Sequence, residues 1–292
     1  MLYNLSNIKV IKSILEKHGF KFTKSLGQNF IINPSVCPKM AEFCCENEKS
    51  GILEIGPGIG VLTIELAKRF KKVVSVEIDT NLIPILSETT ADFENIKIIN
   101  KDILKVDLNQ LYKTEFLNCE KVAVCANLPY YITSEIVMYL LENNPGFKSL
   151  TFMVQKEAAE RICADFGTRE SGAISVAIRY YGKPRVLFNV SRGSFIPAPK
   201  VDSSVIKIDI NSDISSKIKN KEKFFQIIKA TYSKRRKNIL NSLSMHFKIS
   251  KEEILKILNT ANVDPHSRPE QLKLKDFINI SDFIWLNNYL NL

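Results

Sequence analysis

The sequence predicts an α/β fold, a Rossmann-like sheet with an antiparallel edge strand, followed by a small all-α C-terminal domain. Three observations predict it. Short apolar runs alternate with helix-like runs in the first half of the 292-residue chain, a glycine-rich turn follows the first of these runs, and the apolar spacing becomes helical near the C-terminus. Alternating strands and helices are typical of a parallel sheet that helices cover on both faces.

The predicted parallel strands are short apolar runs, and most end at a polar or glycine-rich turn. Such bounded runs are typical of buried strands. We expect strands at residues 52–55, 72–78, 96–99, 122–126 and 150–154. Helix-like runs follow at 61–70, 81–89, 134–141 and 156–164, and the apolar residues of the first 20 positions indicate a short amphipathic helix.

Two later runs predict the antiparallel edge. Residues 185–190 and 204–210 alternate in polarity, and the proline-rich stretch 195–200 lies between them. Because no helix fits between these runs, and parallel neighbours need a long crossover, we expect the two strands to pair antiparallel at the edge of the sheet.

A polar stretch at residues 211–216 predicts a domain boundary. Beyond it, apolar residues such as Phe224, Ile227 and Ile228 recur at helical spacing. We therefore expect one domain over residues 1–212 and a helical domain over residues 213–292.

The composition favours an intracellular protein with a polyanionic partner. The net charge is +10, which points to nucleic acid before a membrane surface, although a coding bias toward lysine gives the same excess. The six cysteines and three histidines lack zinc-ligand spacing, so we expect no metal and interpret the cysteines as buried hydrophobes in a reducing compartment. The absence of a signal-peptide core and of a membrane-length apolar run predicts a cytoplasmic location and no membrane partner.

Three strand ends outline a candidate nucleoside site. Gly56, Gly58 and Gly60 allow a tight turn and close ligand approach, but their spacing differs from the dinucleotide pattern and disfavours a pyrophosphate cradle. Glu77 is placed to accept hydrogen bonds from both hydroxyls of a ribose, and Asp102 from an adenine amino group. Each feature alone also fits a compact turn, a solvated carboxylate or a loop cap. Together they fit S-adenosylmethionine best.

The tetrapeptide Asn127-Leu128-Pro129-Tyr130 follows the fourth strand and forms a candidate acceptor site. The nitrogen of an aromatic amine is a poor nucleophile because its lone pair is delocalised. The Asn127 oxygen and a carbonyl near Leu128 could accept both N–H bonds and favour a tetrahedral nitrogen, while Tyr130 stacks on the base. Phe195 is either a second stacking ring or a buried anchor of the edge strand.

Four consecutive cations, Lys234, Arg235, Arg236 and Lys237, lie beside a predicted helix. They either form a solvated helix face or contact phosphates, and the net charge favours phosphate contact.

These residues resemble the KsgA (RsmA) family of small-subunit rRNA adenine dimethyltransferases, within the wider group that includes the Erm enzymes. The resemblance spans nearly the whole chain, in a fixed order of motifs. It covers the family's motifs at residues 25–31, 54–60, 127–130, 152–157 and 195–203 and the basic segment at 233–243, and it implies that the sheet is that of a class I methyltransferase.

The resemblance implies donor contacts at a defined set of positions, and Asn29 and Ile31 are identified by it alone. These positions are Asn29, Ile31, Gly56, Glu77, Asp102 and Asn127. It further implies N6,N6-dimethylation of two adjacent adenosines near the 3′ end of 16S rRNA in the 30S subunit, a role in late subunit assembly, and a monomer.

Three alternatives stay open. An Erm-type enzyme would modify 23S rRNA and confer macrolide resistance, although the segments around the catalytic motif lean toward KsgA. An assembly factor would bind the same RNA with dispensable catalysis. The basic second domain argues against a small-molecule methyltransferase.

Overall fold

The computed structural model describes residues 3–23, 26–44, 47–210, 214–234 and 236–286. The chain divides into two compact units. The first comprises Met1–Ala159 and Arg185–Ile210, and the second comprises Glu160–Pro184 and Asn211–Leu292. Residues 160–184 group with the C-terminal helices in this division. The domain limits expected from sequence, residues 1–212 and 213–292, stay a prediction.

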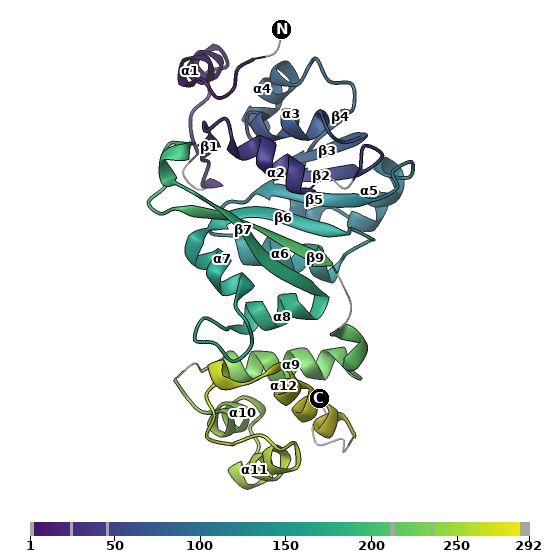
Figure 1. Ribbon diagram of the computed structural model, residues 1–292, viewed down its shortest axis with the longest axis vertical. Helices are drawn as coiled ribbons and strands as arrows, with labels where there is room; N and C mark the ends of the chain where they lie inside the picture. Colours follow the sequence, from purple (N-terminus) through teal and green to yellow (C-terminus); the bar gives the residue numbers. More distant parts are fainter. Residues whose placement is uncertain (1–2, 24–25, 45–46, 211–213, 235, 287–292) are drawn as a thin grey trace. The chain divides into compact units, whose positions relative to one another are not determined.

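The described part of the first unit is built on a seven-stranded sheet in the order β4-β3-β2-β5-β6-β9-β7 (Figure 1). In this order the strands are β4 (Ile96–Asn100), β3 (Lys72–Glu77), β2 (Gly51–Ile55), β5 (Val122–Asn127), β6 (Ser149–Gln155), β9 (Ser203–Ile210) and β7 (Gly182–Val190). The first five are parallel, and β9 runs antiparallel to β6. The predicted parallel sheet with an antiparallel strand toward one edge is confirmed.

The register of the central strands brings the candidate residues to one edge. Ile55 of β2 is level with Val76 of β3 and with Ala126 of β5. The next residue of each chain segment is therefore Gly56, Glu77 or Asn127. Because parallel strands end at the same edge, the glycine turn, the acid and the carboxamide emerge side by side.

Helices flank this sheet (Figure 1). They are α1 (Ile8–Lys17), α2 (Val36–Cys44), α3 (Val61–Ala67), α4 (Ile83–Thr89), α5 (Leu108–Glu115), α6 (Thr133–Glu142) and the start of α7 (Lys156–Cys163). Successive strand residues such as Ile52 and Leu53 are both fully buried. Since successive side chains point to opposite faces, both faces of the sheet are covered, as the apolar runs predict.

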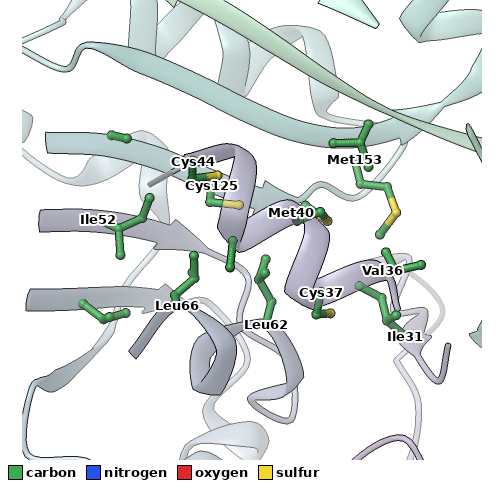
Figure 2. Close-up of a cluster of buried hydrophobic side chains, with 14 of the residues drawn as sticks. Ile31, Val36, Cys37, Met40, Cys44, Ile52, Leu62, Leu66, Cys125 and Met153 are labelled. Carbon is green, nitrogen blue, oxygen red and sulfur yellow. The ribbon is translucent and has the colours of Figure 1, made fainter. Parts of the chain in front are cut away.

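A sulfur-rich cluster forms the core on the face that carries α2 and α3. Figure 2 shows Cys44 of α2 beside Cys125 of β5, with Met40 and Met153 nearby. Burial raises the pKa of Cys37 far above that of an exposed thiol, so this side chain stays neutral. The interpretation as small buried hydrophobes holds for Cys37, Cys44 and Cys125, whereas Cys119 and Cys163 are only partly buried. Cys45 lies outside the described residues.

The second unit is helical, as predicted, with α8 (Ala173–Tyr181), α9 (Lys221–Tyr232), α10 (Ile239–Phe247), α11 (Lys251–Thr260) and α12 (Leu274–Leu286). Its core joins Phe224, Ile227, Leu243, Ile257 and Phe277, all fully buried. Asn220, Asn238 and Ser250 cap three of these helices, each accepting a bond from the third N–H of its helix.

Helix α8 belongs to this core. Val176 lies in the same apolar cluster, and the ring of Tyr180 is 5.8 Å from that of Phe224. Among the described helices, none is long and apolar enough to cross a membrane.

Candidate active site

A cavity opens at the edge of the sheet where β2, β3 and β5 end. Three segments from distant parts of the sequence line most of it, and they are residues 26–31, residues 56–62 without Gly60, and residues 127–130. Glu77, Ile78 and Leu82 complete the lining. The cavity thus unites the glycine turn, the acid after β3 and the tetrapeptide, which the sequence places on separate strand ends.

The turn between β2 and α3 requires glycine. Gly56, Gly58 and Gly60 have φ angles of 66°, 61° and 92°, in the left-handed region that disfavours other residues. Space is limiting as well, because a Cβ on Gly58 would lie 3.2 Å from the ring of Phe30. The turn is consequently both tightly folded and in close contact with the N-terminal segment.

Glu77 ends β3 and is 4% exposed. Its Oε1 accepts a hydrogen bond from the Asp79 N–H at 2.8 Å, and its Oε2 accepts one from the Gly58 N–H at 3.3 Å. Burial raises the pKa of Glu77, and these two backbone donors oppose the shift. Each carboxylate oxygen keeps a second lone pair, so the side chain is held in place and can still accept bonds from a ligand.

Asp102 does not line the cavity. Its Oδ1 accepts a bond from the Leu104 N–H at 3.0 Å and caps a 3₁₀ turn at residues 103–105. In this structure Asp102 therefore acts as a loop cap, one of the two interpretations that the sequence allows. Its role toward an adenine stays a prediction.

Asn127 is the last residue of β5, and its carboxamide is fixed by one hydrogen bond. Nδ2 donates to the backbone oxygen of Asn29 at 3.2 Å, which leaves Oδ1 as the acceptor atom of the group. The next residue, Leu128, is anchored by its N–H to the carbonyl of Met153 at 3.1 Å. A strand end and a cross-segment bond together orient the start of the tetrapeptide.

Tyr130 lines the cavity with a half-buried ring. Its hydroxyl lies 2.8 Å from Oγ of Ser203, at the start of β9. Burial raises the pKa of the phenol, while the Ser203 hydrogen bond opposes the shift. The side chain is therefore a neutral aromatic surface held at its far end.

Phe195 is not part of the cavity wall. It is 3% exposed, lies in the sulfur-rich cluster beside α2 and α3, and belongs to β8 (Phe195–Ile196). This strand pairs antiparallel with β1 (Phe30–Ile31), so that Phe195 is opposite Ile31. As a correction to the stacking-ring expectation, the buried-anchor interpretation describes this conformation, because the ring is enclosed by apolar neighbours.

The N-terminal segment contributes more than the sequence singled out. Asn29 and Ile31, identified by resemblance alone, both line the cavity. Gln28 lines it too and donates from Nε2 to Oδ2 of Asp79 at 2.6 Å. Asp79 is 6% exposed. No local pattern marks this contact, because its partners are 51 residues apart.

The three described residues of the basic run lie in the turn between α9 and α10. Lys234, Arg236 and Lys237 are exposed there. Arg235 and Ser25, which carry parts of the resemblance, lie outside the described residues. Within the described ranges, no group of three or more His, Cys, Asp or Glu side chains is arranged to hold a metal ion.

Comparisons with known proteins point to one family. Residues 19–285 match the family model described as ribosomal RNA adenine dimethylase. The "Ribosomal RNA small subunit methyltransferase A" of Anoxybacillus flavithermus is 41% identical over 94% of both chains. The protein of that name from Clostridioides difficile is 42% identical over 96% of both chains.

Solved structures show the same fold. A dimethyladenosine transferase from Plasmodium falciparum aligns with a TM-score of 0.72 and 25% identity, over 89% of this chain and 98% of that one. The 23S rRNA methyltransferase ErmE aligns with a TM-score of 0.65 and 24% identity, over 87% and 98%. The chain thus belongs to the ribosomal RNA adenine dimethylase family, whose members are S-adenosylmethionine-dependent methyltransferases.

Proposed function

We propose that this chain transfers methyl groups from S-adenosylmethionine to N6 of two adjacent adenosines near the 3′ end of 16S rRNA, within the 30S subunit. The observation that carries the proposal is the convergence of Glu77, Asn127 and Tyr130 on one cavity. The choice of ribosomal subunit is supported by relatives that are named small-subunit methyltransferases and match over almost their full length.

The cavity fits a nucleoside donor without phosphates. The carboxylate of Glu77 retains acceptor sites for two ribose hydroxyls, and the glycine turn presents backbone at close range. Asn29 and Ile31 would cover the donor from the N-terminal segment, and Asp102 would bind its adenine. When bound, the donor supplies an electrophilic methyl group on sulfur.

The acceptor adenine would be bound by the tetrapeptide. Oδ1 of Asn127 and the carbonyl of Leu128 accept the two N–H bonds of the amine, which restores a directed lone pair on nitrogen. Tyr130 stacks on the base and holds the ring plane. No strong base is required, since the nitrogen becomes cationic before it loses its proton.

The helical domain would bind the RNA. We assign phosphate contacts to Lys234, Arg235, Arg236 and Lys237, and we expect a cytoplasmic monomer that acts late in subunit assembly. With the domain limits proposed from sequence, we assign methyl transfer to residues 1–212 and RNA binding to residues 213–292.

The direct test uses 30S particles that lack these methyl groups, purified protein and labelled S-adenosylmethionine. The expected result is dimethyl label on adjacent adenosines of 16S rRNA. Label only in 23S rRNA would assign the chain to the Erm-type activity instead. Particle binding and maturation without any label would favour an assembly factor.

Asn127→Ala tests the acceptor chemistry. Losing an acceptor aimed at developing charge typically lowers kcat by roughly 10²–10³-fold. Asn143→Ala is a matched control, because Asn143 is an exposed residue of the same unit whose amide caps α6 through the Tyr139 carbonyl. Donor affinity is measured separately, since Asn127 also holds Asn29. A normal rate for Asn127→Ala would exclude the proposed role.

A further inference from the structure

The side chains of Gln28 and Asp79 connect the N-terminal segment to the donor side of the cavity. Gln28 Nε2 donates to Asp79 Oδ2 at 2.6 Å, a short bond between two residues far apart in sequence. Asp79 is almost fully buried, at 6% exposure. A hydrogen bond to a carboxylate is about twice as strong as one between neutral groups.

Both side chains are fixed by further bonds. Oε1 of Gln28 accepts the Thr23 N–H at 3.0 Å, so the carboxamide bridges its own segment and Asp79. The other carboxylate oxygen of Asp79 accepts two bonds from Asn81, one from its N–H and one from Nδ2, both at 3.0 Å. The bond thus joins two preorganised groups.

Asp79 is also linked to the acid that faces the donor. Its N–H donates to Oε1 of Glu77 at 2.8 Å. The carboxylate that faces the donor and the residue that contacts Gln28 are therefore joined by a direct hydrogen bond. On the opposite side of the segment, the Asn29 carbonyl accepts the Asn127 amide. Residues 26–31 are consequently held at two points, one beside Glu77 and one beside the acceptor motif.

We propose that Gln28 and Asp79 are positioning residues for the methyl donor, whose mutual hydrogen bond holds residues 26–31 against the cavity and slows donor release. This inference rests on the proposed donor site at Glu77. A bond that served stability alone would leave donor affinity unchanged. A positioning bond changes the affinity and dissociation rate of the donor, while the rate at saturating donor changes little.

The test uses the full chain with Gln28→Ala, Gln28→Glu and the exchanged pair Gln28→Glu/Asp79→Asn. In Gln28→Glu the hydrogen-bond donor is replaced by a second carboxylate beside Asp79. The exchanged pair restores one donor and one acceptor, because an Asn amide can donate to the new Glu. Gln110→Ala, an exposed residue of α5, is the matched control.

Three measurements report on the bond. They are the Kd of S-adenosylmethionine by calorimetry, its dissociation rate by stopped flow, and amide hydrogen exchange of residues 26–31 without donor. We expect Gln28→Ala to weaken donor binding roughly 10-fold to 100-fold, through faster release. Gln28→Glu should be weaker still, the exchanged pair should recover most of the affinity, and exchange in residues 26–31 should rise in both single variants.

Normal donor affinity in a folded Gln28→Ala variant would overturn the inference, as would an exchanged pair no better than Gln28→Glu. Failure of the unmodified chain to bind S-adenosylmethionine is a separate outcome that overturns the donor site itself, and this inference with it. If a variant were too unstable for calorimetry, unchanged protection of residues 26–31 in the remaining variants would still refute it.

Discussion

Glu54 is a buried acid one residue before the end of β2. Its side chain is 1% exposed, and Oε2 accepts a hydrogen bond from Oγ of Ser75 at 2.7 Å. Burial raises the pKa of Glu54 to about 7, and the nearby Glu77 adds to the shift. The carboxyl therefore gains a proton in the folded protein at pH values where it is ionised in the unfolded chain.

This difference predicts a pH dependence of stability. Between the unfolded pKa of 4.5 and the folded value of about 7, the folded state binds more protons, so stability falls as pH rises through this window. The loss approaches about 3 kcal/mol above pH 7, on the order of 1.4 kcal/mol per pKa unit. Glu54→Gln keeps an acceptor for Ser75 and should remove this slope.

Urea unfolding at pH 5 and pH 8 measures the effect. We expect Glu54→Gln to gain stability relative to the unmodified chain at pH 8 and to show little gain at pH 5. The exposed Glu142→Gln is the control for charge removal in the same unit. Parallel pH profiles for Glu54→Gln and the unmodified chain would refute the prediction.

At the residue scale, the sequence identified side chains whose position follows from a strand end. Glu77 and Asn127 lie where the predicted parallel sheet requires them, and Gly58 has the positive φ that its turn demands. Neither burial is decided by local sequence, because nothing indicated the burial of Asp79, and for Phe195 the buried-anchor and stacking-ring interpretations both stayed open. Both depend on the N-terminal segment, which packs against them from more than 50 residues away.

At the scale of elements, α1 is attached to α4 through one acid. Glu88 accepts hydrogen bonds from Lys17 and from His18, each at 2.7 Å, and another from the hydroxyl of Tyr3. The bond with Lys17 is the largest of the causes that hold the pKa of Glu88 at about 2. Apolar side chains of α1, including Ile11, pack on the same element.

We expect acid to loosen this helix. Because the folded pKa of Glu88 is below its ordinary value of 4.5, its contribution is complete above pH 4.5 and is lost as pH falls through about 2. Glu88→Gln should therefore raise amide hydrogen exchange in α1 at neutral pH, to a level that the unmodified chain reaches only in acid.

Hydrogen exchange resolved by peptide distinguishes this local effect from global unfolding. Exchange in β5 should stay unchanged in Glu88→Gln, and Glu142→Gln should leave both segments protected. Equal protection of α1 in Glu88→Gln and the unmodified chain at pH 7 would show that apolar packing alone holds the helix.

Helices and strands were predicted correctly where the apolar periodicity of a single segment indicates them. The five parallel strands were expected within about two residues of their observed bounds, and α4 begins with a 3₁₀ turn capped by Asp79 where one helix was expected. The two-residue strands β1 and β8 were missed. They pair residues 30–31 with 195–196, and so short a pair leaves no periodicity in the sequence.

For the whole molecule, the order of apolar runs was sufficient to predict the fold class, and the comparisons confirm it. The two compact units do not follow the order of the chain. Helix α8 precedes β7 in the chain yet shares the core of the C-terminal helices, through Val176. The second compact unit is built from two separate segments of the chain, whereas a single polar stretch marks only one boundary, so the proposed limits at residues 1–212 and 213–292 stay a prediction.

The charge distribution of the whole molecule leads to the final prediction. Lys234, Arg236 and Lys237 are exposed in the α9–α10 turn, and no ion pair to them is found in the part of the chain that the structure describes. Reversing all three to Glu should weaken binding to unmethylated 30S particles and flatten its salt dependence, because each lost phosphate contact lowers the logarithmic slope by roughly one. Affinity for S-adenosylmethionine should not change.

A second triple variant separates local contact from net charge. Reversing Lys248, Lys251 and Lys256, which are exposed elsewhere in the helical unit, changes the total charge by the same amount. If the turn contacts phosphate, only the first variant should lose several-fold affinity and salt slope. Equal losses in both variants would reduce the effect to long-range attraction by the +10 chain, and no loss in either would remove the turn from the RNA interface.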